Sequence, residues 1–246
     1  AMGNDITSIA GILRVHGSDR AEHVALVQDA RRLTWADLHA RSAQVAQGLA
    51  SVGVASQDRV AFLDKNGIEH FEVFFGASLL NAVCVDVNWR LAAPEIEYIV
   101  NDAQAKVLVV GPDFVAVLDA IAANLTSVAR ILVIGGHENY ESYEDWVASF
   151  PADDPGAESQ NGDVAFQLYS SGTTGRPKGV MLSNDNFFSL LPLAKEMWEL
   201  THDSVNLIAM PLFHIGGGGW AVAGMYEGCT SVIFRELDPA ALIRTI

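Results

Sequence analysis

The sequence predicts an α/β fold in which mostly parallel sheets are flanked by helices. Short runs of β-branched and other apolar residues alternate along the chain with segments of helical period. Several of these runs are almost wholly apolar, which is typical of strands covered by helices on both faces. With 246 residues, half of them hydrophobic, the chain can form one large domain or two smaller ones.

Eight apolar runs are predicted to be strands because they are short and rich in β-branched residues. They cover residues 24–28, 59–63, 83–87, 106–110, 130–134, 164–169, 205–210 and 230–234. The first helix among them is predicted to begin after Thr34, because Asp37 three residues later resembles a capping box. Pro94 fits the first position of another helix, because a backbone N–H there would have no acceptor within the helix and proline lacks this group.

The composition excludes two classes of protein. Thirty acidic against 15 basic residues give a formal charge of −15, whose field would repel a phosphate backbone, so no binding of nucleic acid is expected. Two cysteines are too few for a disulfide scaffold. Because Cys84 and Cys229 lie in largely apolar runs, both are predicted to be reduced and buried.

Neither the start nor the middle of the chain resembles a membrane-directed segment. The start lacks the basic cluster and apolar block of a signal peptide, and Ala1 before Met2 resembles the remnant of a cleaved tag. Residues 204–226 carry no Asp, Glu, Lys or Arg and could span a bilayer by length. Pro211 and four consecutive glycines make them a poor spanning helix, so a buried strand–loop–helix is predicted. No transmembrane segment is expected, and the protein is expected to be cytoplasmic.

Residues 151–163 (PADDPGAESQNGD) form the one clear linker, since they combine Pro, Gly and acidic residues without apolar periodicity. They divide the chain into a predicted first α/β subdomain, 1–163, and a second, 164–246. A last helix beginning at Asp238 carries apolar residues to the end, so we expect a truncated second subdomain that self-associates through an apolar edge.

Four carboxylates are expected on solvated faces: Glu141, Glu144, Asp153 and Asp154.

The strongest chemical signal is the segment LYSSGTTGRPKGV at residues 168–180, which follows a predicted strand. Its glycines can take positive φ, successive N–H groups can form an anion site, and four hydroxyls and Lys178 can bind phosphate oxygens. A P-loop NTPase needs Gly-Lys-Ser/Thr at its end, and Pro177 and Gly179 break that pattern. A helix is predicted next, capped by Asn184 or Asp185 and kinked at Pro192.

Residues 169–180 resemble the phosphate-binding loop of the adenylate-forming superfamily, which includes acyl-CoA synthetases, coumarate-CoA ligases, luciferases and the adenylation domains of peptide synthetases. A second segment, MPLFHIGG at 210–217, resembles the family's Pro-x-Phe-His-x-x-Gly element beside the acyl pocket. A third, NWRL at 88–91, is similar to a stretch that many acyl-CoA synthetases show. The resemblance covers nearly the whole chain and implies the amino-terminal part of the adenylate-forming fold.

The resemblance implies a ligase that joins a carboxylic acid to AMP, using Mg-ATP, and then transfers the acyl group to a thiol, usually coenzyme A. It assigns these residues to the ATP phosphates: Ser170, Ser171, Gly172, Thr173, Thr174, Gly175 and Lys178. It places His214 between nucleotide and acyl pocket, which makes Lys178 and His214 the candidate catalytic residues. Ile215, Gly216 and Gly217 would complete the substrate pocket, Arg176 is expected to be exposed, and no protein site for a metal is predicted.

Two departures from the family pattern bear on function. Some long-chain members carry a gating Trp at the position of Gly218, and the glycines at 216–219 could instead leave room for an acyl chain or allow close helix packing. Family segments that bind adenine and ribose are absent, so the chain is expected to be an amino-terminal fragment, inactive alone. A hydrophobic, chiefly fatty, acid is favoured. An aryl or amino-acid adenylating member, a non-catalytic nucleotide-binding module and a structural fragment that pairs with another chain remain as alternatives.

Overall fold

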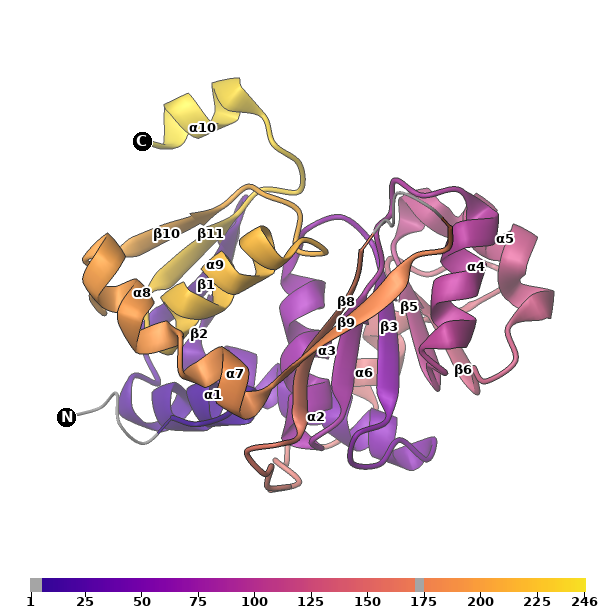
Figure 1. Ribbon diagram of the computed structural model, residues 1–246, viewed down its shortest axis with the longest axis horizontal. Helices are drawn as coiled ribbons and strands as arrows, with labels where there is room; N and C mark the ends of the chain where they lie inside the picture. Colours follow the sequence, from indigo (N-terminus) through magenta and orange to yellow (C-terminus); the bar gives the residue numbers. More distant parts are fainter. Residues whose placement is uncertain (1–5, 171–174) are drawn as a thin grey trace.

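The computed structural model describes residues 6–170 and 175–246 and confirms the α/β class, with two sheets flanked by helices (Figure 1). The smaller sheet has the strand order β10-β11-β1-β2, and the larger has the order β7-β6-β5-β3-β4-β8-β9. The strands are β1 (Val24–Gln28), β2 (Arg31–Thr34), β3 (Arg59–Leu63), β4 (Val83–Asp86), β5 (Val107–Val110), β6 (Arg130–Val133), β7 (Glu141–Ser142), β8 (Val164–Ser170), β9 (Lys178–Ser183), β10 (Val205–Ile208) and β11 (Thr230–Ile233).

All eight predicted strands are present, and among the described strands three more were not predicted: β2, β7 and β9. Each of the three lies at the edge of a sheet, where a strand needs no apolar run. The pairs β1–β2 and β8–β9 are antiparallel, and the other described strand pairs are parallel. The expectation of mostly parallel sheets is therefore confirmed.

The helices connect these strands and cover the faces of the sheets. They are α1 (Ile9–Asp19), α2 (Trp35–Ser51), α3 (Ile68–Leu79), α4 (Ala93–Asp102), α5 (Val115–Ile121), α6 (Tyr143–Ala148), α7 (Asn184–Phe188), α8 (Leu191–Trp198), α9 (Ile215–Tyr226) and α10 (Pro239–Thr245). Residues 112–114 and 122–124 form short 3-10 helices on either side of α5.

The helix starts agree in part with the capping signals in the sequence. Thr34 and Asp37 form the predicted capping box of α2, and Pro94 lies in the first turn of α4. The prediction that Asn184 or Asp185 caps the helix after the loop was wrong, because the hydroxyl of Ser183 accepts the N-cap hydrogen bond. Pro192 lies in the first turn of α8, so two separate helices replace one kinked helix.

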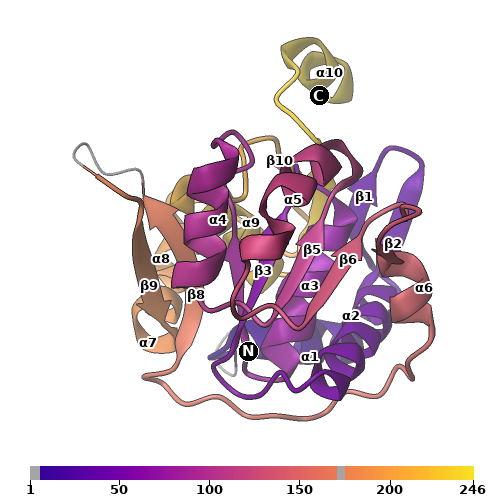
Figure 2. The ribbon, with the colours of Figure 1, turned by 90° about the vertical axis from the view of Figure 1, so that its right-hand side faces the viewer.

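The core lies on both faces of the larger sheet, as the apolar strands predicted. Side chains alternate between the faces of a strand. In β3, Val60 and Phe62 join the cluster under α1, α2 and α3, whereas Ala61 and Leu63 join the cluster under α4 and α5. Figure 2 shows α4 and α5 on the second of these faces. The central strands β3, β4 and β5 of the larger sheet are therefore buried from both sides, which explains their nearly continuous apolar runs.

The boundary predicted at residue 163 does not separate the two sheets. Strands β8 and β9 follow residue 163 but complete the larger sheet through β4, while β1 and β2 belong to the smaller sheet through β11. A further contact joins the sheets, because Arg235 after β11 donates to the buried carboxylate of Asp64 after β3 at 2.9 Å. The chain thus passes between the sheets twice, and the division into subdomains at residue 163 stays a prediction.

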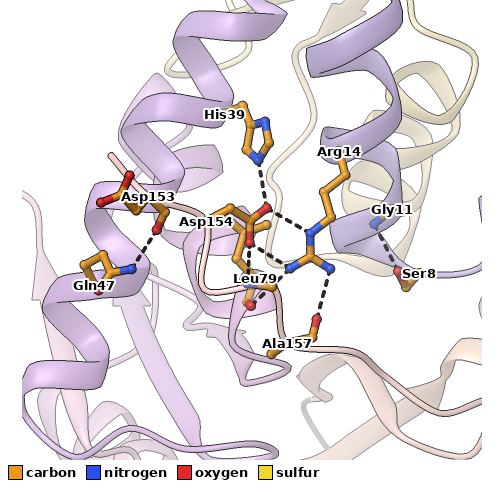
Figure 3. Close-up of polar contacts among 10 residues, drawn as sticks. Ser8, Gly11, Arg14, His39, Gln47, Leu79, Asp153, Asp154 and Ala157 are labelled. Carbon is orange, nitrogen blue, oxygen red and sulfur yellow. Dashed lines mark hydrogen bonds and ion pairs between the residues drawn. The ribbon is translucent and has the colours of Figure 1, made fainter. Parts of the chain in front are cut away.

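The linker at residues 151–163 is fixed to the body through Asp154, which corrects the expectation that this carboxylate is solvated (Figure 3). Asp154 accepts hydrogen bonds from Arg14 on α1 at 2.9 Å and from His39 on α2 at 2.8 Å. It also accepts the Gly156 amide at 2.8 Å. Burial opposes ionisation, but the hydrogen bonds from Arg14 and His39 outweigh it and hold the pKa of Asp154 well below its usual range.

Replacing Asp154 by Ala should lower the free energy of unfolding at pH 7 by about 1–2 kcal/mol, because Arg14 loses a carboxylate partner. Because the pKa of Asp154 is lower in the folded than in the unfolded state, the ionised carboxylate stabilises the folded state at pH values above the unfolded-state pKa of ~4. This stabilisation is lost as the pH falls through the folded-state pKa. The difference between wild type and D154A should therefore shrink below about pH 4 in urea titrations. The exposed neighbour provides the control: D153A should change stability little, and an equal loss in both variants would contradict this account.

Cys84 and Cys229 are buried and unpaired, as predicted. Among the described residues, no helix has both the length and the apolar character needed to cross a membrane. Helix α10 stands apart from the rest of the molecule, and Ile243 and Ile246 are exposed (Figure 1). Self-association through this end stays a prediction.

Candidate active site

The described parts of the predicted phosphate-binding segment, residues 168–170 and 175–180, belong to the antiparallel pair of strands β8 and β9 and to the residues that lead into β9. Ser170, the last residue of β8, is opposite Lys178, the first of β9, and the Ser170 hydroxyl lies 3.5 Å from the Lys178 carbonyl oxygen. A strand, not a helix, therefore follows the segment, which corrects the prediction. The assigned residues Ser171, Gly172, Thr173 and Thr174 lie outside the described residues.

The described ends of the hairpin expose groups that can bind an anion. Ser170 and Lys178 are both exposed, and they supply a hydroxyl and an ammonium group from paired positions of the two strands. Gly175 has a φ of 126°, a conformation that residues with a Cβ rarely adopt, as the glycine-rich sequence suggested. Arg176 is exposed, as expected, and its guanidinium lies 4.9 Å from the centre of the Tyr98 ring on α4.

The second motif forms the turn from β10 into α9. His214 is the N-cap residue of α9, with extended backbone angles, and Ile215 begins the helix. Phe213 is buried, whereas His214, Ile215 and Gly216 are exposed. The predicted strand–loop–helix over residues 204–226 is therefore present, but it is buried only in part: Val205, Met210 and Ile215 are exposed, and the turn presents His214 at the surface.

A cavity of about 220 Å³ lies between this turn and the hairpin. It is lined by Phe166, Leu168, Tyr169, Ser170, Val180, Leu182, Phe213, His214 and Ile215. The structure thus brings Ser170 of the first motif and His214 and Ile215 of the second to one pocket, and Gly216 and Gly217 are not among its lining residues. Most of the walls are apolar, and no carboxylate or cationic lysine or arginine faces the pocket from the described residues.

The four glycines after His214 divide into two kinds. A Cβ on Gly217 would lie 2.3 Å from the carbonyl oxygen of Pro211, and one on Gly218 would lie 2.6 Å from Cζ of Phe166. A Cβ on Gly216 or Gly219 would meet no atom within 4 Å. Gly217 and Gly218 therefore allow close packing of α9, one of the two roles expected of this run. A tryptophan gate at position 218 would collide with Phe166.

Asn66 is a site residue that sequence reasoning missed. It lies between β3 and α3, is 4% exposed, and holds the turn that leads to His214. Its side-chain amide donates to the carbonyl oxygen of Met210 at 2.9 Å, and its side-chain oxygen accepts the Leu212 N–H at 3.1 Å. No local pattern marks Asn66, because its partners lie 144 and 146 residues away in sequence.

The third resembling stretch, NWRL at 88–91, also meets the second motif. The rings of Trp89 and Phe213 pack edge to face, with their centres 6.2 Å apart. The guanidinium of Arg90 lies 5.0 Å from the Trp89 ring and 5.9 Å from the Phe213 ring. Segments that are far apart in sequence therefore build one wall next to the turn that carries His214.

Among residues 6–170 and 175–246, one group of three side chains has metal-ligating chemistry: His70 on α3 and Cys84 and Asp86 on β4. All three are buried, and Nε2 of His70 lies 2.6 Å from Oδ1 of Asp86. Ligand atoms of a tetrahedral zinc ion lie roughly 3.3 Å apart, so His70 and Asp86 would have to separate to admit one. Burial, reinforced by Asp86, raises the pKa of the Cys84 thiol, which favours its protonated form. The group is arranged as a buried hydrogen-bonded cluster.

Similarity to known proteins points to the same family as the sequence motifs that meet at this pocket. The family model described as AMP-binding enzyme matches residues 13–246. The chain belongs to this family. The resemblance to adenylate-forming enzymes is thereby confirmed for almost the entire chain.

Relatives of this chain include ligases for different acids. It is 35% identical over 227 residues to fatty acid–[acyl-carrier-protein] ligase ScoC of Streptomyces coeruleorubidus, covering 89% of this chain and 42% of the relative. It is 32% identical over 216 residues to feruloyl-CoA synthase of an Amycolatopsis species, covering 87% of this chain and 41% of the relative. The chain thus spans about two fifths of the length of these curated relatives.

The fold is also similar to that of a solved amino-terminal domain. The inhibitor-bound N-terminal domain of FACL13 from Mycobacterium tuberculosis superposes with a TM-score of 0.88 at 29% identity. The match covers 96% of this chain and 59% of that chain. The expectation of an amino-terminal adenylate-forming fold is confirmed by this likeness.

Proposed function

We propose that this chain supplies the phosphate-binding loop and part of the acyl pocket of an AMP-forming acid–thiol ligase. The observation that carries the proposal is the meeting of Ser170 and His214 at one apolar pocket, with Lys178 across the hairpin from Ser170. A carboxylic acid bound in this pocket would have its carboxylate next to the phosphates bound by the loop. This juxtaposition is what adenylation needs, since the reaction gains most from positioning two charged reactants.

In the first step a carboxylate oxygen bonds to the α-phosphorus of ATP, and the bond to the oxygen of the departing pyrophosphate breaks. Lys178 and the Ser170 hydroxyl would hold the charge that moves onto pyrophosphate. Mg²⁺ bound to ATP would reduce the repulsion between the phosphates and the incoming carboxylate. In the second step a thiol sulfur bonds to the acyl carbon, AMP leaves, and the thiol proton passes to solvent.

We infer that the acid is hydrophobic, with fatty acids favoured. The pocket is lined by Phe, Leu, Val and Ile side chains, and an ammonium group there would find no described carboxylate partner. This argues against the amino-acid adenylating alternative. An aryl acid is the second candidate, because a feruloyl-CoA synthase lies among the relatives at 32% identity. Coenzyme A is the proposed thiol, and a carrier protein is its alternative because of the likeness to ScoC.

Changing Lys178 to Ala should weaken binding of Mg-ATP to the chain by about tenfold or more, because a charge-assisted contact to phosphate is lost. Isothermal titration calorimetry would measure the dissociation constant. Lys195 on α8 is a matched control, since K195A removes the same charge from an exposed lysine outside the pocket. Equal affinities of K178A and K195A would contradict the role of Lys178.

We also expect the 246-residue chain alone to give no acid-dependent ATP–pyrophosphate exchange, because it spans only about two fifths of its relatives. Exchange above background would overturn this expectation. Tight binding of ATP by a protein that never turns it over, even in a longer form, would favour the non-catalytic module instead.

Acyl-adenosine sulfamates, which imitate acyl-AMP, would test the acid class. The fatty-acyl compound should bind most tightly, an aryl compound less so, and an aminoacyl compound at least tenfold more weakly than the fatty one, since its ammonium would be buried unpaired. A preference for the aminoacyl compound would reverse our assignment of the pocket.

A further inference from the structure

Helix α4 contacts both ends of the phosphate-binding segment through one of its faces. Tyr98 and Asp102 are four residues apart on α4 and so point to the same side. The Tyr169 hydroxyl, immediately before Ser170, donates to Asp102 Oδ2 at 2.6 Å. The Arg176 guanidinium, two residues before Lys178, lies 4.9 Å from the centre of the Tyr98 ring. One helix face thus contacts the end of β8 and the residues that lead into β9.

The two contacts differ in strength and in setting. Tyr169 is partly buried, and burial together with the hydrogen bond to Asp102 raises the pKa of its hydroxyl, so the hydroxyl stays protonated to more alkaline pH than a free tyrosine. Arg176 is exposed beside an open groove between α4 and residues 175–177, so its contact with Tyr98 is the weaker of the two. Asp102 should consequently matter more than Tyr98.

The location of Asp102 supports a role in holding Tyr169. It is the last residue of α4, where a negative charge interacts unfavourably with the helix dipole. The hydrogen bond from Tyr169 offsets this cost. Tyr169 is also one of the residues that line the 220 Å³ pocket, and its side chain packs toward α4, so the same contact ties α4 to a strand that forms part of the proposed acyl site.

We propose that Tyr98 and Asp102 of α4 are positioning residues that hold the two described ends of the phosphate-binding segment in place before ATP binds. This inference rests on the proposed function of that segment. Neither residue needs to touch ATP. By fixing Tyr169 and Arg176 in advance, they reduce the ordering that ATP would otherwise have to impose, and a ligand binds more tightly to a preorganised site.

Calorimetry with Mg-ATP on variants of the chain tests the inference. D102A should weaken binding about 5–30-fold, and Y98L about threefold, whereas Y98F should retain wild-type affinity because it keeps the ring face under Arg176. A matched control exists elsewhere in the fold, since Tyr140 donates to Asp119 at the same distance of 2.6 Å on an exposed surface. D119A should leave the affinity unchanged, and equal affinities of D102A and D119A would overturn the proposal.

Hydrogen exchange without ATP separates this inference from the proposed function. The amides of Arg176, Lys178 and Gly179 should exchange faster in D102A and Y98L than in the wild type and in D119A. Unchanged exchange at these amides would refute positioning by α4. If the wild-type chain binds no ATP but D102A shows faster exchange, the proposed function fails while positioning by α4 stands. A variant that only loses overall stability would lower its melting temperature without raising exchange at these amides selectively.

Discussion

Replacing Gly217 by Ala should destabilise the protein by about 3 kcal/mol or more, whereas the same change at the adjacent Gly216 should be neutral or slightly stabilising. The added methyl at position 217 would lie 2.3 Å from the carbonyl oxygen of Pro211 and 3.2 Å from that of Met210. Both are backbone atoms, so no side-chain rotation can relieve the clash. Either α9 or the turn before His214 must move.

The two variants form a matched pair because they make the same chemical change one residue apart in one helix turn. At position 216 the methyl meets nothing within 4 Å, and alanine gains its ordinary helical preference over glycine. For a chain of this length, 3 kcal/mol corresponds to a melting temperature about 6–12 °C lower. Differential scanning calorimetry of G217A and G216A measures the difference. Similar melting temperatures would show that α9 does not pack as tightly as described.

The G217A change should also weaken binding of a fatty-acyl adenosine sulfamate, because moving the turn displaces Phe213 and His214 from the pocket. We expect G216A to bind it like the wild type. Loss of binding in both variants would mean that Gly216 itself contacts the ligand, contrary to its place outside the lining.

Replacing Asn66 by Ala should cost about 2–4 kcal/mol, the second large effect. The change leaves the Met210 carbonyl and the Leu212 N–H without their partner, next to a side chain that is 4% exposed. An unsatisfied buried polar group costs about 1–3 kcal/mol, which applies to the buried Leu212 N–H, and the partly buried Met210 carbonyl adds about 1 kcal/mol. Urea denaturation would measure the loss of stability.

Two further variants make the role of Asn66 specific. N66D keeps an acceptor for the Leu212 N–H but loses the donor to Met210, so part of the effect should remain. N124A removes an exposed asparagine whose amide donates to Glu97, and it should change stability by less than about 0.5 kcal/mol. If N66A proved no more harmful than N124A, Asn66 would not hold the turn.

The strands that could be predicted are those marked by their own local sequence. The eight apolar strands were predicted because burial between helices demands nearly continuous apolar runs, and that demand is written in each strand separately. The edge strands β2 and β9 were missed because half of their surroundings is solvent, so their sequences RRLT and KGVMLS carry no such mark. The capping box at Thr34 was found because its two hydrogen bonds join residues three apart.

The candidate site shows the same division. The motifs containing Lys178 and His214 could be recognised because each is continuous in sequence. Asn66 and Asp154 could not, because the groups that give them a role lie more than 100 residues away. Asp154 was expected to be solvated for this reason, and only its approach to Arg14 and His39 revealed the contact (Figure 3).

The sequence by itself determined the α/β class, the apolar strands, the family and the two motifs, since each depends on the order and spacing of nearby residues. Only the tertiary structure decided which strands share a sheet, why Gly217 and Gly218 must be glycine, and which helix contacts the phosphate-binding segment. Such facts depend on which distant surfaces meet. Strand β1 illustrates the reason: its residues fit a buried strand in any sheet, and pairing with β11 places it in the smaller one.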